Sequence, residues 1–238
     1  MKEPSNAHPS HSSDSPDRRR FLQQMGGATG AAALLLAGCD STGGMPDEEE
    51  MDDVVLDFST DFGVLNYAYA LEQLEAAFYA EVAANFYGDA GSVEGEYFRE
   101  LADHEGIHRD FLAAAIPQLG GTAIPALEVD FSGVDFSSRS EVLGIARVLE
   151  DTGVAAYNGA GMFLSDPTLL TLAGKIVSVE ARHAAAVRSL INPGSTDFAG
   201  DDVVDPSTGL DRADAPSEIL AAVDSTGFVQ TPIRIVNA

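Results

Sequence analysis

Two stretches decide the fold: EGIH at Glu105–His108 and EARH at Glu180–His183. Residues three apart in a helix lie on the same face, so the carboxylate and the imidazole of each stretch can reach one metal ion. A single Glu-x-x-His tetrapeptide is common, and it usually marks an exposed acidic residue beside a surface histidine. Two copies, each near the middle of a predicted helix, indicate a metal site inside a helical bundle.

A second repeated pattern, Glu-x6-Tyr, precedes each of these stretches. Glu72 is followed by Tyr79 and Glu150 by Tyr157. Seven residues are close to two helical turns, so each tyrosine shares a face with its glutamate. The order Glu-x6-Tyr and then Glu-x-x-His therefore occurs twice, which indicates an internal duplication.

The four matched motifs predict a site for two metal ions. Four carboxylates and two imidazoles suit iron or manganese, whereas copper or zinc would more often require further histidines or cysteines. Without metal, four carboxylates in an apolar core would repel one another and lose hydration. Tyr79 and Tyr157 are expected to donate hydrogen bonds to these carboxylates rather than to bind metal. The predicted ligands are Glu72, Glu105, His108, Glu150, Glu180 and His183.

Two neighbouring residues offer alternative readings. Glu75 lies three residues after Glu72, near the same face, and could be the ligand instead. Glu72 is preferred because it matches Glu150 in the repeat, whereas Glu75 matches Gly153. His104 is expected to point away from the core, because adjacent positions on a helix diverge by roughly 100°.

The pattern of apolar residues and helix stops predicts four helices in one domain. The two short turns of the chain flank a long connection, residues 118–136, which is too rich in glycine and proline for a helix. The fold class is therefore all-α, with a C-terminal extension, residues 193–238, expected to lie on the bundle surface around a short helix, Pro216–Val223. The four predicted helices are Asp61–Phe86, Ser92–Ile116, Ser138–Leu164 and Pro167–Asn192.

The helical motifs together resemble a known family. The runs Leu65–Tyr79, Glu105–His108, Leu149–Tyr157 and Val179–His183 resemble the ferritin-like family, which includes bacterial exported proteins and plant desiccation-related proteins. The resemblance covers roughly residues 58–192, and a long crossover between the second and third helices is also typical of ferritin-like bundles. It implies a ferritin-like fold and a di-iron centre, with manganese as the alternative metal.

The first 38 residues are predicted to be an export signal. DRRRFLQ at Asp17–Gln23 resembles the twin-arginine motif, and the apolar run Met25–Ala37 is too short for a membrane span of roughly 20 residues. LAGC at Leu36–Cys39 resembles a lipobox, in which Cys39 is lipidated and becomes the mature N-terminus. The alternative is a tail with a chance arginine run, but the order and spacing of the elements favour a signal.

Charge further limits the partners. The chain has 38 acidic and 13 basic residues and a formal net charge of -25, which repels phosphate backbones and excludes nucleic acid as an expected partner. Acidic residues 39–57 are predicted to be a flexible tether between the lipid anchor and the bundle at residues 58–192. The expected location is the periplasmic or outer face of a membrane, and a homodimer is compatible with the sequence.

Three functions fit these observations. The first is a di-metal oxidoreductase that reacts with oxygen or peroxide outside the cytoplasm. The second is a metal-binding or stress-protective protein without turnover, as the desiccation-related relatives suggest. The third is a bundle that keeps the ligand residues but acts by presenting its acidic surface to a partner.

Overall fold

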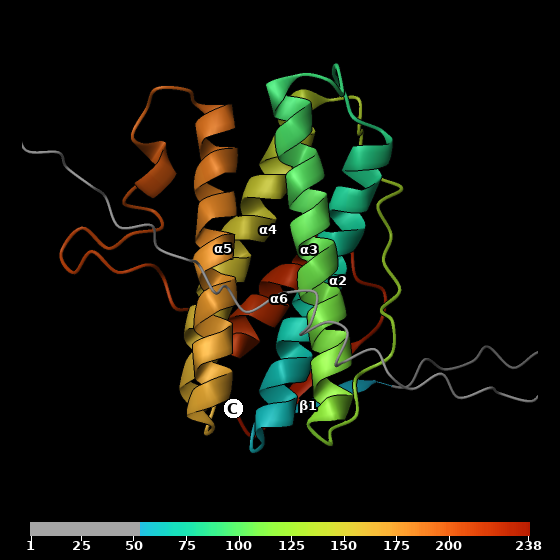
Figure 1. Ribbon diagram of the computed structural model, residues 1–238, viewed down its shortest axis with the longest axis vertical. Coiled ribbons are helices and arrows are strands. Elements are labelled where there is room, and N and C mark those ends of the chain that lie inside the picture. Colours follow the sequence, from blue (N-terminus) through green and yellow to red (C-terminus); the bar gives the residue numbers. More distant parts are fainter. Residues whose placement is uncertain (1–52) are drawn as a thin grey trace, which may run out of the picture. The chain divides into compact units, whose positions relative to one another are not determined.

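The computed structural model describes residues 53–238. The predicted signal peptide, Cys39 and most of the predicted tether lie outside the described residues. Four long helices form a bundle in which α2 pairs with α3 and α4 with α5 (Figure 1). This arrangement confirms the predicted all-α, ferritin-like bundle. Its helices are α2 (Asp61–Ala84), α3 (Val93–Gln118), α4 (Arg139–Ala160) and α5 (Pro167–Ile191).

Each long helix begins at a side chain that caps it. Thr60, Ser92, Ser138 and Asp166 all accept a hydrogen bond from a backbone N–H in the first turn of the following helix. The predicted ends were less accurate. The α3 helix continues through Pro117 to Gln118, so the proline lies inside its last turn and the helix ends one residue later. The α4 helix ends at Ala160 and continues as a short 3-10 helix, η1 (Gly161–Phe163).

The crossover from α3 to α4 is held along α2 by two amide side chains. Asn66 and Gln73 each donate one hydrogen bond to the crossover backbone and accept one from it, at 2.8–3.3 Å. Their partners lie between Thr122 and Leu127. Because seven residues are about two turns, both amides face the same strip of extended chain. These four hydrogen bonds therefore hold the crossover against α2.

The C-terminal extension packs against the bundle and also reaches the start of the domain. Helix α6 (Pro216–Thr226) contacts α4 and buries Ile219 and Val223. Strand β2 (Ile233–Val236) pairs in parallel with β1 (Val54–Asp57). The end of the predicted tether is therefore an ordered strand, because Val54 and Leu56 are buried by a partner about 180 residues away in sequence.

A buried arginine ties the extension to two helices. Arg188 of α5 forms paired hydrogen bonds of 2.7–2.9 Å with Asp151 of α4, and further bonds of 2.8–3.1 Å with Asp202. It also donates to the carbonyl of Asp197 in the short 3-10 helix η2 (Asp197–Ala199). The planar guanidinium suits such a double fork.

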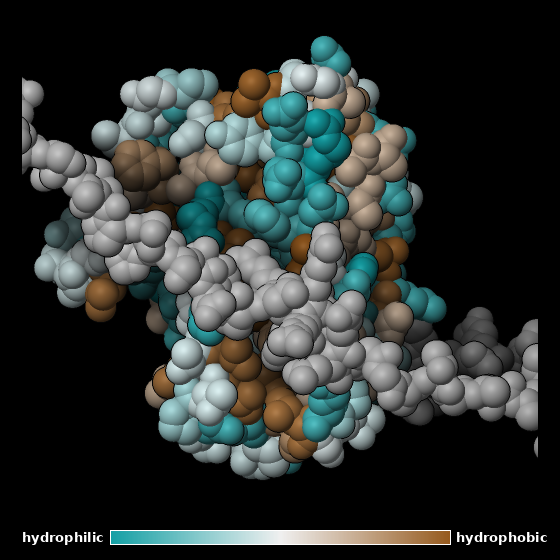
Figure 2. Space-filling view, in the orientation of Figure 1, coloured by the Kyte–Doolittle hydropathy of each residue, from teal (hydrophilic) through white to brown (hydrophobic). Residues whose placement is uncertain are grey.

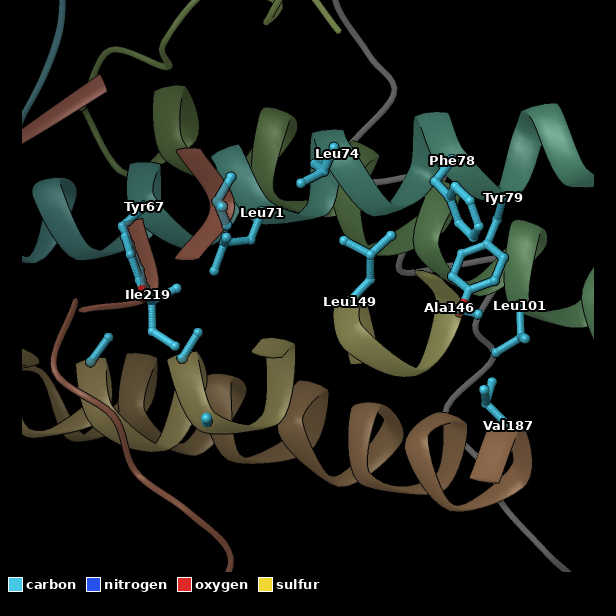
Figure 3. Close-up of a cluster of buried hydrophobic side chains, with 14 of the residues drawn as sticks. Tyr67, Leu71, Leu74, Phe78, Tyr79, Leu101, Ala146, Leu149, Val187 and Ile219 are labelled. Atoms are coloured by element: carbon cyan, nitrogen blue, oxygen red, sulfur yellow. The ribbon is translucent and has the colours of Figure 1, made fainter. Parts of the chain in front are cut away.

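The interior contains two apolar clusters. The larger one contains Phe78, Tyr79 and Phe98, and in Figure 3 the Tyr79 ring extends from α2 toward α4. The smaller one contains Leu65, Leu112 and Ile176, and lies where α2 and α5 begin and α3 ends. Among residues 53–238, every helix is too short or too polar to span a lipid bilayer.

Candidate metal centre

All four long helices contribute side chains to one buried site. Glu72 comes from α2 and Glu150 from α4, while α3 and α5 each supply one Glu-x-x-His pair. The four glutamates are 0% exposed, and His183 is 6% exposed. Ionised carboxylates are rarely buried this deeply unless cations compensate them.

The six predicted ligands form two overlapping sets. In each set the potential ligand atoms all lie within 4.8 Å of one another, which is close enough to surround one ion. Glu105 and Glu180 belong to both sets. The first set is Glu72, Glu105, His108 and Glu180, and the second is Glu105, Glu150, Glu180 and His183. The structure thus brings the six residues together, while metal binding by them stays a prediction.

Both histidines direct Nδ1 at the carboxylates. The Nδ1 atom of His108 lies 3.0 Å from Glu180 Oε1, 3.2 Å from Glu105 Oε2 and 3.4 Å from Glu72 Oε2. The Nδ1 atom of His183 lies 2.7 Å from Glu105 Oε1 and 3.5 Å from Glu150 Oε2. His108 therefore faces both shared glutamates as well as Glu72, whereas His183 faces the shared Glu105 and also Glu150.

Protonation compensates part of the buried charge when metal is absent. Burial raises the pKa of Glu72 to about 7, and burial together with the charge of Glu72 raises the pKa of Glu180. Burial also opposes ionisation of Glu105, but its contacts with His108 and His183 outweigh this and lower its pKa to about 2. Burial alone would lower the histidine pKa values; the carboxylates instead raise them to about 12 for His108 and about 10 for His183.

Several polar atoms at the centre nevertheless lack a hydrogen-bond partner among the described residues. Glu105 Oε1 and His183 Nδ1 are close, but their orientation does not make a directed hydrogen bond, so the contact is electrostatic. Inward-facing oxygens without donors are costly in a folded protein unless a cation binds them. The unpaired atoms are Glu72 Oε2, Glu105 Oε1, Glu150 Oε2, both oxygens of Glu180, and His183 Nδ1.

The two tyrosines bind the glutamates crosswise. Tyr79 of α2 donates to Glu150 Oε1 of α4 at 2.5 Å, and Tyr157 of α4 donates to Glu72 Oε1 of α2. The sequence indicated that tyrosines would donate to the carboxylates, but not that each would serve the other helix's glutamate. The crossing leaves Oε2 of both glutamates facing the histidines.

The expectation that His104 points away from the core is wrong in one respect. Its side chain is 45% exposed, yet Nδ1 lies 2.9 Å from His183 Nε2, and the two rings stack with centroids 5.2 Å apart. The imidazole is long enough to reach from α3 across to α5. His104 therefore fixes the orientation of His183, a role that helical periodicity within α3 did not reveal.

Glu75 is a fifth buried carboxyl group beside the centre. It is 3% exposed and belongs to neither ligand set, so the geometry favours Glu72 over Glu75 as the ligand. Its Oε1 lies only 3.0 Å from the position that a Cβ on Gly153 would occupy. Burial and the charge of Glu180 raise its pKa well above the usual range. In the sequence repeat, Glu75 corresponds to Gly153. This glycine was the sequence feature that could have indicated a buried carboxyl group at position 75.

Ferritin-like bundles with carboxylate metal sites have one glutamate on each of two helices and a Glu-x-x-His pair on each of the other two, and this chain has the same arrangement of residues. The model of the family described as "Ferritin-like domain" matches residues 60–193, which is more than half of the chain, and the chain belongs to this family. A search of curated proteins found no match.

Proposed function

We propose that the centre binds two iron ions, or two manganese ions, and uses them to react with dioxygen or peroxide. The observation that carries this proposal is the sharing of Glu105 and Glu180 between two ligand sets whose inward oxygens lack other partners. One ion would leave Glu72 and His108, or Glu150 and His183, without a cation.

The donor atoms fit this pair of metals. Each set offers three carboxylates and one imidazole, a combination of oxygen and nitrogen that suits iron and manganese. The four ionised glutamates balance the charge of two divalent cations once both histidines are neutral. Binding therefore removes the repulsion that protons compensate in the metal-free protein.

The surrounding residues prepare the centre for redox chemistry. Two ferrous ions would supply one electron each to dioxygen or peroxide, with ferrous ions from the medium acting as the reductant. Tyr79 orients Glu150, and Tyr157 orients Glu72. His104 orients His183. In the metal-free protein, burial and the charge of Glu180 raise the pKa of the neighbouring Glu75 carboxyl group, and the apolar clusters exclude bulk water.

The expected location follows from the N-terminal motifs. We propose that twin-arginine export carries the folded protein, with its metal loaded, across the membrane and that lipidated Cys39 anchors it on the periplasmic or outer face. This proposal rests on residues 17–39 of the sequence. A contact with membrane lipid follows from the same motifs. The net charge of -25 argues against a nucleic-acid partner, and a homodimer remains a prediction.

The burial of the predicted ligands favours a second candidate function. The four glutamates have no exposed surface, so bulky organic substrates have no access to the metals. A metal-binding protein that protects against oxidative or drying stress without turnover is consistent with this burial.

One comparison tests the proposed function. The full chain and the Glu105→Gln variant are loaded anaerobically with ferrous iron, and the ferrous oxidation rate is measured after addition of oxygen or peroxide. Asp103→Asn is the matched control, because Asp103 is an exposed carboxylate on the same helix. Rapid oxidation by wild type and Asp103→Asn, but not by Glu105→Gln, supports the proposal. Two bound ions that do not react with either oxidant support the protective alternative instead.

A further inference from the structure

An apolar cavity of about 40 Å³ lies directly beside the centre, in the half of the bundle that contains the smaller cluster. Ala68, Leu112 and Ile176 line it, and each lies four residues from a predicted ligand on its own helix. Tyr157 also lines the cavity while its hydroxyl donates to Glu72. Only one layer of side chains therefore separates this space from the metal ligands.

The cavity lies in one half of the bundle, and a comparison of matched positions in the two duplicated halves shows which side chains differ there. In the other half, Phe98 stands seven residues before Glu105, is 1% exposed and packs 6.2 Å from the ring of Tyr79. The matching position, seven residues before Glu180, is Ala173, and Ala173 lines the cavity beside Tyr157. The second copy thus has a methyl group where the first has a phenyl ring.

A second matched pair shows the same loss of volume. Val82 is ten residues after Glu72 and is completely buried, whereas the matching residue after Glu150 is Ala160, which lines the cavity. Close-packed interiors rarely leave such voids without a cost in stability. Two matched positions, Ala173 and Ala160, thus have small side chains beside the same cavity, and this repeated difference points to a use for the space.

The cavity leads toward the face between α3 and α5. Leu119, at the end of α3, lines it and is 51% exposed. Figure 2 shows hydrophobic surface in the lower half of this face, where Figure 1 places the lower ends of α3 and α5. The apolar lining of the cavity therefore extends to a residue that is exposed on this hydrophobic part of the surface.

The volume and the apolar lining of the cavity indicate which kind of molecule can occupy it. A water molecule needs ~10–15 Å³ and two to four polar partners, whereas a cavity that admits benzene measures ~150 Å³. The lining is almost entirely apolar, and the Tyr157 hydroxyl already has Glu72 as its acceptor. The space therefore disfavours water, is too small for an aromatic or long-chain substrate, and suits a diatomic apolar molecule.

We propose that this cavity binds dioxygen and delivers it to the two-metal centre past Tyr157. The proposal rests on the proposed function, because it assigns the entry site of one oxidant in that reaction. Hydrogen peroxide is polar and would not partition into this cavity.

Xenon is the first probe, because it occupies dry apolar cavities and requires no metal or turnover. The full chain is examined by xenon NMR titration or after xenon pressurisation of crystals. Wild type should bind xenon next to Tyr157, and Ala173→Phe should abolish this binding by restoring the ring found at Phe98. Gly174→Phe is the matched control, because Gly174 is exposed and has open space around its Cβ position.

The second readout separates the two oxidants. Ferrous-loaded Ala173→Phe should react roughly tenfold more slowly with dioxygen than wild type at low oxygen concentration, with an unchanged rate toward hydrogen peroxide. Ala173→Val and Ala173→Leu provide a graded series if the phenyl ring prevents folding. The rate with dioxygen should fall as the side chain grows, at constant metal content.

Different failures identify different errors. Absence of xenon in wild type, or equal dioxygen rates across the series, overturns the dioxygen site while leaving the redox function intact. Xenon binding in a protein that oxidises no ferrous iron overturns the proposed function and, with it, the dioxygen role. Equal slowing with both oxidants also contradicts the proposal, because it shows damage to the centre.

Discussion

Tyr79 on α2 and Glu150 on α4 are joined by a 2.5 Å hydrogen bond across the middle of the bundle. Its counterpart joins Tyr157 to Glu72 in the opposite direction. The two bonds connect the duplicated halves. Each holds one oxygen of Glu150 or Glu72, so the other oxygen of that glutamate stays directed at the centre. Their energetic role can be measured directly.

Replacing Tyr79 with Phe should destabilise the metal-free protein by about 1–3 kcal/mol, because Glu150 loses the hydroxyl that donates to it and remains buried. Urea unfolding measures the change. Tyr97→Phe is the control, since Tyr97 is an exposed tyrosine with no hydroxyl hydrogen bond within the described chain. A Tyr79→Phe protein as stable as this control would show that the crossed bond contributes nothing.

The metal-free protein should lose stability as pH rises from about 5 to 10. The pKa values of Glu72, at about 7, and His183, at about 10, are raised in the folded state. Groups with raised pKa values stabilise the fold below their unfolded pKa, and this contribution is lost as pH rises through the folded value. The contribution of Glu105 to stability has the opposite pH dependence, because its pKa is lowered in the folded state. Since this pKa is about 2, the contribution of Glu105 changes only in acid.

The same protons make metal affinity increase with pH. Binding must displace them from the histidines and glutamates, so tighter binding and a larger stabilisation by metal are expected at pH 8 than at pH 6. Thermal unfolding with and without manganese, measured across this range, provides the comparison. A stabilisation that is independent of pH would mean that the metal binds somewhere else.

Removing His104 should weaken metal binding by roughly 10-fold to 100-fold, because His183 would lose the neighbour that fixes its ring. Competition with a chromogenic chelator measures the affinity of His104→Ala. Glu100→Gln serves as the control, since this exposed carboxylate touches only the outer edge of His104. Equal affinities for all three proteins would limit His104 to a surface role.

Arg188→Ala should release the segment around Asp202 from the bundle. Loss of the paired bonds to Asp151 and Asp202 is expected to cost about 1–3 kcal/mol and to increase amide exchange in residues 195–214. Hydrogen exchange followed by mass spectrometry locates the change. Arg182→Ala, which removes only a surface bond to Ser178, should leave that segment protected. Unchanged exchange in Arg188→Ala would show that other contacts hold the extension.

The sequence predicted those features that depend on position within a single helix. The spacing of Glu105 and His108 determines their common face, and the caps at Ser92 and Ser138 determine where two helices begin. The family model confirms the ferritin-like fold that these patterns indicated. Glu72 and Glu150 followed from the repeat, because duplication gives equivalent positions equivalent faces.

Features that depend on contacts between distant segments were not predictable in this way. The pairing of Val54–Asp57 with Ile233–Val236 and the stacking of His104 on His183 depend on how separate elements meet in space. The crossed tyrosines belong to the same class. The space beside Ala173 became visible only when the packing of both halves could be compared.

Metal stoichiometry in single-ligand variants tests the central claim most directly. Elemental analysis of the full chain should give two iron or manganese ions per wild-type molecule. Glu72→Gln or Glu150→Gln should lose one ion, and Glu105→Gln should lose both because it removes a shared ligand. Retention of two ions by Glu105→Gln, or a wild-type protein that binds no metal and is fully stable without it, would contradict the two-metal centre.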